Sequence, residues 1–164
     1  MPERVWETTV ERTFAAPRDV VWALIADTNR WNRAQGLAPG RYEWREVEGK
    51  REYVATAKEL GQTLVWYEPP YQWSEGWFIE GRRRFLAGPV SFATFRTVLS
   101  DDAGKTKVVA TSIVGGSTFL ASMLVPTIVQ PKMKAALGRY HAAIEEALAR
   151  GVAREGGEGD PAVV

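Results

Sequence analysis

A dense run of aromatic side chains in the middle of the chain is the part of the sequence best suited to holding a ligand. The segment VWYEPPYQWSEGWF, residues 65–78, contains six aromatic residues, including three of the seven tryptophans in the chain. Aromatic walls with a few polar groups are typical of small-molecule pockets. Buried aromatic side chains are also ordinary core material, because each removes a large apolar area from water. The segment therefore predicts either a filled core or a lined cavity.

Strand alternation assigns this run and the residues after it to two faces. Over QWSEGWFIEGRRRF, residues 72–85, a period of two places on one face Trp73, Glu75, Trp77, Ile79, Gly81 and Arg83. We predict that this face is the concave one. A charge there is costly unless it is paired, hydrated or facing a polar ligand, so Glu75 and Arg83 are candidate ligand-orienting groups. The alternative is a bulge near Gly76 or Gly81 that turns both charges to solvent.

Other residue types that support catalysis or metal binding are scarce. The chain has no cysteine and one histidine, which removes thiolate nucleophiles, zinc–thiolate sites and histidine clusters. His141 lies at the edge of an apolar helical stripe, and Glu145 is its one local carboxylate, so we predict a structural role for it. The sequence thus predicts no catalytic residue, no metal site and no cofactor.

The charge pattern does not favour a polyanionic partner. Twenty-one Lys and Arg residues balance twenty Asp and Glu residues, for a net charge of +1. The arginines at 82–84 alternate between faces beside Glu80, which is typical of a solvated strand. The segment VGGST, residues 114–118, lacks the lysine of a phosphate-binding loop, so we predict that it turns the chain and caps a helix. We predict no nucleic-acid partner.

One uncharged segment is long enough to suggest a membrane span. It runs from Val108 to Pro131. Its first part is rich in β-branched residues, and Gly115 and Gly116 interrupt it before Ser117, a candidate helix N-cap. We therefore predict a strand, a turn and a buried helix, with no transmembrane segment. The charged start MPERVWETTVERTF does not resemble a signal peptide, and we predict a cytoplasmic protein.

The order of elements predicts an α+β fold. A strand over residues 4–14 is followed by a helix from Pro17 to about Ala26 and a second short helix around Trp31. About six strands follow between Arg41 and Val114, joined by short loops that imply antiparallel pairing. A helix over residues 117–150 carries Pro126 and Pro131, which should kink or split it.

These elements can bury all their apolar faces if the sheet curls around the last helix. We therefore predict a helix-grip fold: a curved antiparallel sheet of about seven strands around a long C-terminal helix, with two short helices after the first strand. Residues 1–150 form the single domain. The aperiodic, glycine-rich segment 151–164 is expected to be a tail or a linker.

Several phrases of the sequence are similar to a known superfamily. The segment ERTFAAPRDVVWALIADTNRWN, residues 11–32, resembles the opening of START-like (SRPBCC) proteins, which include polyketide cyclases, lipid-transfer domains and Bet v 1-like plant proteins. A narrower resemblance is to bacterial domains found alone or beside adenylate/guanylate cyclase domains. It is carried by LIADTNRWNRAQGL, VWYEPPYQW with Glu68-Pro69-Pro70, RRRFLAGPV and VPTIVQPKMKAALGRY. No nucleotide-cyclase catalytic segment is found in the 164 residues.

The resemblance implies a cavity between the sheet and the last helix. The candidate ligand-binding residues are then Trp66, Trp73, Glu75, Trp77, Ile79, Arg83, Phe95, Leu124, Ile128, Leu137 and Tyr140. The first hypothesis is a module that binds a hydrophobic, lipid-like or aromatic small molecule. A second is a cyclase/aromatase-like enzyme in which Arg83, Glu75 or Tyr140 polarises a carbonyl or moves a proton. A third is a regulatory domain of a nucleotide-cyclase system, and a homodimer or a signalling partner is left open.

Overall fold

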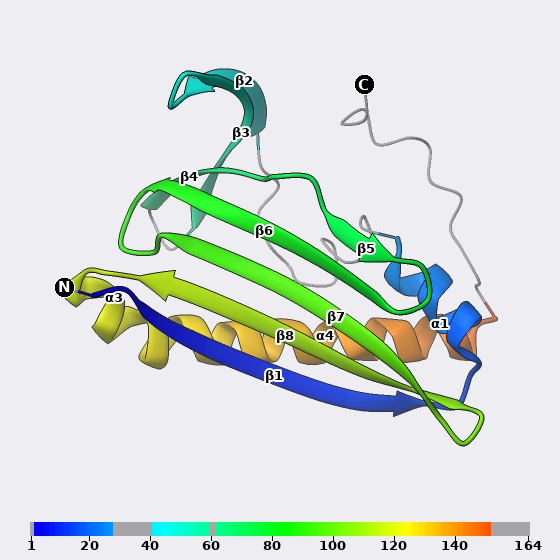
Figure 1. The fold of residues 1–164 in the computed structure, drawn as a ribbon. Coiled ribbons are helices and arrows are strands. Elements are labelled where there is room, and N and C mark those ends of the chain that lie inside the picture. The colour runs from blue at the N-terminus through cyan, green and yellow to red at the C-terminus, as the bar shows by residue number, and fades with distance from the viewer. Residues whose placement is uncertain (1, 28–40, 60–61, 152–164) are drawn as a thin grey trace.

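An eight-stranded antiparallel sheet curves around one long helix (Figure 1). The computed structural model describes residues 2–27, 41–59 and 62–151. In chain order the elements are β1 (Arg4–Phe14), α1 (Arg18–Ile25), β2 (Arg41–Val47), β3 (Lys50–Glu59), β4 (Gln62–Tyr67), β5 (Gln72–Ser74), β6 (Phe78–Ala87), β7 (Phe92–Asp102), β8 (Lys105–Gly116), α3 (Phe119–Leu124), η1 (Val125–Val129) and α4 (Gln130–Ala149). The predicted helix-grip fold is confirmed. The second short helix predicted around Trp31 and the tail predicted beyond Gly151 lie outside the described residues.

The strands lie in the order β1-β8-β7-β6-β4-β3-β2, and β5 pairs with β6 beside this path. The sequence predicted about seven strands, and the described residues form eight, because the predicted strand over residues 72–85 is two strands. Residues 75–77 form a turn between β5 and β6, and Gly76 adopts a φ of +74°, which is accessible mainly to glycine. The prediction of one continuous strand there was wrong. A tight turn does not change the aromatic content of the segment, so that content gave no sign of the turn.

One face of the sheet can be followed across five strands from its register. Cross-strand partners share a face, and Trp6 of β1 pairs with Val114 of β8, which pairs with Ala93 of β7, which pairs with Arg83 of β6. In β4, Trp66 pairs with Phe85 next to a bulge and lies on the same face. This inner face is turned toward α4.

The helix α4 packs tightly against the sheet over only part of its length. Toward its C-terminal end, Tyr140, Ile144 and Ala147 are buried with Leu24 of α1 and Leu99 of β7 in one core cluster. A second, smaller cluster of buried residues brings together the other end of the sheet, α3 and η1, through Ala93, Val114, Ala121 and Val125.

The predicted break in the last helix occurs as a π-helical turn. Thr118 caps the N-terminus of α3 through its side-chain oxygen, which accepts from the Ala121 backbone N–H at 3.0 Å, so the predicted Ser117 cap was displaced by one residue. Pro126 lies in η1 and has no N–H to donate, and the wider π turn accommodates it. Gly116 ends β8, so the uncharged segment is part strand and part helix. Among the described residues, no helix is both long and apolar enough to cross a bilayer.

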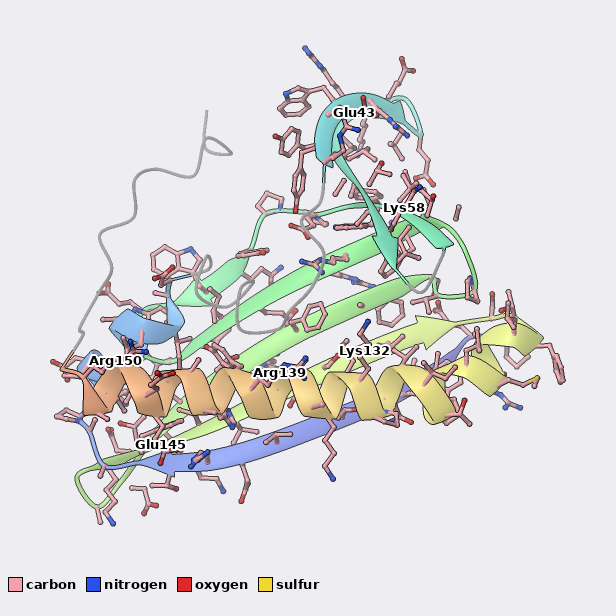
Figure 2. The ribbon with its side chains drawn as sticks, turned by 180° about the vertical axis from the view of Figure 1, so that it is seen from behind. Glu43, Lys58, Lys132, Arg139, Glu145 and Arg150 are labelled. Carbon is pink, nitrogen blue, oxygen red and sulfur yellow. The ribbon has the colours of Figure 1, made fainter. Side chains whose placement is uncertain are left out.

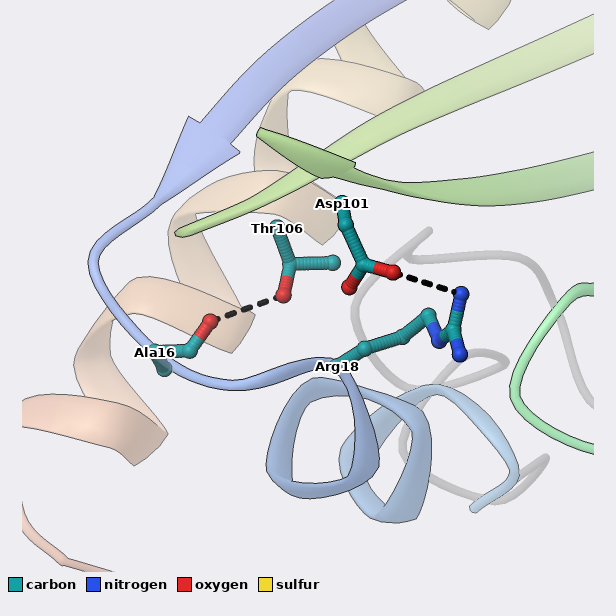
Figure 3. Close-up of polar contacts among 4 residues, drawn as sticks. All are labelled: Ala16, Arg18, Asp101 and Thr106. Atoms are coloured by element: carbon teal, nitrogen blue, oxygen red, sulfur yellow. Dashed lines mark hydrogen bonds and ion pairs between the residues drawn. The ribbon is translucent and has the colours of Figure 1, made fainter. Parts of the chain in front are cut away.

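The connection between β1 and α1 is held by two polar contacts (Figure 3). The buried Thr106 hydroxyl of β8 donates to the Ala16 carbonyl at 2.7 Å. The Arg18 guanidinium of α1 donates to the Asp101 carboxylate of β7 at 2.9 Å. These contacts fix the start of α1 against the C-terminal end of β7 and the N-terminal end of β8.

His141 lies inside the core of this end of the domain. It is 1% exposed, its ring meets that of Phe14 edge-on at 5.9 Å, and neither ring nitrogen has a hydrogen-bond partner among the described residues. Burial, and then the charge of Arg12, lower the pKa of His141 from 6.5 to about 4. The histidine is therefore a neutral packing residue at neutral pH, in line with its predicted structural role.

Replacing the buried hydroxyl at position 106 should loosen the β1–α1 connection. Thr106→Val keeps the shape of the side chain but deprives the Ala16 carbonyl of its donor, so we expect a loss of about 1–3 kcal/mol in the free energy of unfolding. Urea denaturation measures this loss. Thr106→Ser keeps the hydroxyl and is the control. Equal unfolding midpoints for the wild type and the valine variant would show that this bond contributes nothing.

The buried histidine should make the fold acid-sensitive. The pKa of His141 is lowered in the folded state, so the unfolded chain takes up its proton first as the pH falls below 6.5, and stability is lost down to about pH 4. This one group accounts for up to about 3 kcal/mol. His141→Phe should remove that part, so its unfolding free energy should fall less than that of the wild type over this range. Parallel pH profiles for the two proteins would contradict this account.

Candidate ligand-binding site

A cavity of about 360 Å³ lies between the inner face of the sheet and the segment from α3 to the first turn of α4. Its walls come from β3, β4, β6, β7, β8 and the loop after β6 on one side, and from the helical segments on the other. It is lined by Ala57, Leu64, Trp66, Arg83, Phe85, Ala87, Pro89, Val90, Ala93, Phe95, Val114, Leu124, Ile128, Val129, Lys132 and Met133. Arg83 and Lys132 are the two charged residues of this lining. The site is thus a mainly apolar chamber with two cationic groups.

The Arg83 side chain is held in the cavity wall by a carboxylate and two aromatic rings. Its Nε donates to Oε1 of Glu68 at 2.6 Å, and its guanidinium lies 5.2 Å from the Trp66 ring and 5.4 Å from the Phe95 ring. The same Oε1 accepts from the indole Nε1 of Trp66 at 2.9 Å. The Arg83 and Glu68 side chains are only 16% and 18% exposed. One carboxylate oxygen therefore orients both the arginine and the tryptophan.

A second, smaller space is also bordered by Arg83. It measures about 40 Å³, which is room for two or three water molecules on the order of 15 Å³ each. Arg83 and Phe95 line both spaces, and Glu68, Tyr71, Gly81 and Thr97 contribute to the smaller one. A Cβ atom on Gly81 would lie 2.8 Å from the Tyr71 ring, so the glycine permits that ring to approach β6. The arginine thus marks the polar end of the apolar chamber.

Lys132 belongs to the wall contributed by α4. In Figure 2 this helix lies in front of the sheet. Lys132 and Glu145 are on opposite edges of the helix, with Glu145 on the side of β1. Glu145 forms an ion pair with Arg12 of β1. The helix is therefore tethered to the edge strand by one charge pair, and its other edge contributes to the cavity.

The structure separates the eleven residues predicted from the sequence into groups. Five line the 360 Å³ cavity: Trp66, Arg83, Phe95, Leu124 and Ile128. Ile79 lines the small space beyond Arg83. Trp73 and Glu75 border an open groove between α1 and β5 that Ile79 also reaches. Leu137 and Tyr140 are fully buried in α4 and do not line the cavity, because from that point the helix packs against the sheet.

The turn between β5 and β6 explains the residues that lie outside. Trp73 pairs with Ile79 and shares its face, but it stands on the short strand β5 and is 60% exposed. Trp77 and Glu75 lie in the turn, so the inner-face position predicted for them was wrong. Trp77 is 51% exposed, and the Arg18 guanidinium lies 3.9 Å from its ring, against α1.

Arg83 lies on the inner face, as alternation predicted. A charge on this face is costly unless it is paired, and Arg83 is paired with the Glu68 carboxylate. Its neighbours Arg82 and Arg84 are exposed on the outer face, over the rings of Phe92 and Tyr67. Sequence reasoning did not identify Glu68 as a site residue, although its position two residues after Trp66 was a usable signal. Other lining residues were also missed: Ala57, Leu64, Phe85, Ala93, Val114, Lys132 and Met133.

No acid–base or metal constellation accompanies the cavity in the part of the chain that the structure describes. Within those residues no three His, Asp or Glu side chains gather as metal ligands would. Glu75 borders the outer groove and Tyr140 belongs to the core at the far end of α4, so the three groups of the enzymatic hypothesis do not line one space with Arg83. The chemistry available in the cavity is apolar contact, ring stacking, and hydrogen bonding or ion pairing with the Arg83 guanidinium and the Lys132 ammonium group.

Comparison with known proteins bears on the fold. No protein-family model matches the chain, and no curated protein matches it. Among solved structures, the protein TTHA0849 from Thermus thermophilus is 19% identical, with a TM-score of 0.59 over 89% of this chain and 99% of that chain. Ara h 8.0201 is 17% identical, with a TM-score of 0.58 over 89% and 99%. The Zhui aromatase/cyclase from Streptomyces sp. R1128 is 22% identical, with a TM-score of 0.51 over 92% and 93%. The chain therefore has the same helix-grip fold as these solved structures.

Proposed function

We propose that this protein binds one hydrophobic small molecule in the cavity between the sheet and the start of α4. The observation that carries the proposal is the apolar chamber of about 360 Å³, whose lining contains two charged residues. Ligand pockets typically measure about 300–1,000 Å³ and are walled mainly by apolar and aromatic side chains. The chamber lies near the lower end of this range, which suits a ligand of two or three fused rings or a medium-length acyl chain.

The fold bears a cost for keeping this chamber open. Side chains that line an empty apolar space lose dispersion contacts, and filling such a space usually raises stability. Larger residues at Ala57, Ala87 or Ala93 would fill it, and all three positions carry the smallest side chain with a Cβ. A binding function requires such a cavity, bordered by small residues on three strands. Close packing of a core does not require one.

The comparisons support this proposal at the level of fold. One structural neighbour is an aromatase/cyclase and another is norcoclaurine synthase from Thalictrum flavum, so this architecture is used by proteins that act on small organic molecules. Fold alone does not transfer an activity. The described residues offer Arg83 as the one site group of the enzymatic hypothesis inside the cavity, and binding without turnover is the function that the geometry favours.

Filling the chamber should abolish binding without unfolding the protein. Ala93 lies on the inner face between Arg83 and Val114, so the ring of an Ala93→Phe variant would occupy the chamber. We expect the affinity for an uncharged naphthalene, measured by calorimetric titration, to fall at least tenfold, which corresponds to about 1.4 kcal/mol. The melting temperature should stay the same or rise, because the added ring fills space.

The control makes the same chemical change on the surface. Ala142 is exposed on α4, so Ala142→Phe should bind the probe as the wild type does. Native mass spectrometry of the purified protein adds a second measurement, since a ligand carried over from the expression host should be present in the wild type and absent from Ala93→Phe. Unchanged probe affinity in a folded Ala93→Phe variant would remove the cavity from consideration as the binding site.

A further inference from the structure

We propose that the Arg83–Glu68 pair makes the cavity selective for uncharged ligands that carry a hydrogen-bond acceptor, such as a ketone or an ester, and unfavourable for carboxylates. The inference deepens the proposed function and rests on it. It assigns a ligand class to the cavity from the charges and donors at its polar end.

Arg83 has more N–H donors than the one that Glu68 accepts. A guanidinium has five N–H groups, and Nε supplies one of them. Among the described residues, the acceptor that the structure gives Arg83 is Glu68 Oε1, through Nε. The N–H groups on Nη1 and Nη2 belong to a side chain that lines both the large cavity and the small space beyond it. They are the donors that a bound molecule would meet.

Neighbouring side chains hold these donors firmly in place. Glu68 fixes Nε, while the Trp66 and Phe95 rings lie 5.2 Å and 5.4 Å from the guanidinium carbon. Glu68 is in turn held by the indole N–H of Trp66 at 2.9 Å. A ligand acceptor that reaches this group therefore meets a donor already oriented, and little side-chain freedom is lost when it binds.

The charges of Arg83 and Glu68 affect anionic and uncharged ligands differently. Arg83 and Glu68 are both mostly buried and neutralise each other, so the polar end of the cavity has no net charge from this pair. A carboxylate at Arg83 would gain the attraction of the guanidinium, but the repulsion from Glu68, about 3–4 kcal/mol for charges 4–5 Å apart at an effective dielectric constant near 20, offsets most of that gain. The carboxylate would also lose its hydration on entry. A carbonyl oxygen avoids both costs and still accepts a hydrogen bond from a charged donor, which contributes about 1.5–3 kcal/mol.

The shape of the cavity places the acceptor on the ligand. The apolar walls include Leu64, Phe85, Val114 and Met133, which line the chamber alone, whereas Arg83 lines both the chamber and the small space. The ligand should therefore have an apolar body with the acceptor at one end. Lys132, on the α4 wall, would favour an anion, so the effect of the Arg83–Glu68 pair is measured as the change in probe ratios between the wild type and variants that all retain this lysine.

The experiment measures the dissociation constants of three probes of nearly equal shape: methyl naphthyl ketone, isopropenylnaphthalene and naphthoate. For the wild type we expect the ketone to bind at least ten times more tightly than naphthoate. Arg83→Met should lower the preference for the ketone over the isopropenyl compound by at least tenfold. Arg84→Met makes the same change on the outer face and should leave every ratio as it is in the wild type.

Glu68→Gln supplies an independent test if Arg83→Met does not fold. Glutamine keeps an oxygen that can accept from both Arg83 and Trp66 but removes the negative charge, so the affinity for naphthoate relative to the ketone should rise at least tenfold. An unchanged naphthoate-to-ketone ratio in Glu68→Gln, or an unchanged ketone preference in folded Arg83→Met, would overturn this inference. If none of the three probes binds the wild type, the proposed function itself fails, whereas equal binding of all three keeps the cavity and rejects its selectivity.

Discussion

The incomplete packing of α4 against the sheet is the constraint from which the other features of this domain follow. From Tyr140 onward the inner side of the helix is buried against α1, β1 and β7, and the Thr106 and Arg18 contacts hold α1 at the same end. Before that point, Pro126 and the π turn of η1 place the helical segment so that Leu124, Ile128 and Met133 face the sheet across a space. A helix that packed along its whole length would leave no chamber, because protein interiors close to crystalline density wherever they can.

The charged pair at the end of the chamber solves a problem that the sheet creates. Alternation on β6 turns one of three consecutive arginines inward, and an unpaired guanidinium there would be strongly unfavourable. Glu68 follows β4, the strand that pairs with β6, and its carboxylate meets both the arginine and the tryptophan of these two strands. The pair also gives a mainly apolar chamber one oriented polar group. Under the proposed function, stability and ligand recognition depend on the same carboxylate oxygen.

Much of the fold could be predicted from the sequence, and less of the site. The period of two in residues 4–14, the short loops between the later strands and the two prolines in the last helix each predicted a feature that is present. Of the site residues predicted, Trp66, Arg83, Phe95, Leu124 and Ile128 line the cavity. The errors at Glu75 and Trp77 have one cause. A turn of three residues around Gly76 replaces a continuous strand, and alternation cannot be carried through a turn.

What the sequence by itself determined is local: which segments are strands or helices, which side chains alternate, and that a buried charge at Arg83 would need a partner. These properties depend on residues a few positions apart, where periodicity and propensity act directly. The tertiary structure alone decided that the partner is Glu68, fifteen residues away, and that α4 stands off the sheet at one end while it buries Tyr140 and Leu137 at the other. Such outcomes depend on the bulge in β4, the strand order and the π turn together, because side chains distant in the chain meet only where these set the spacing between layers.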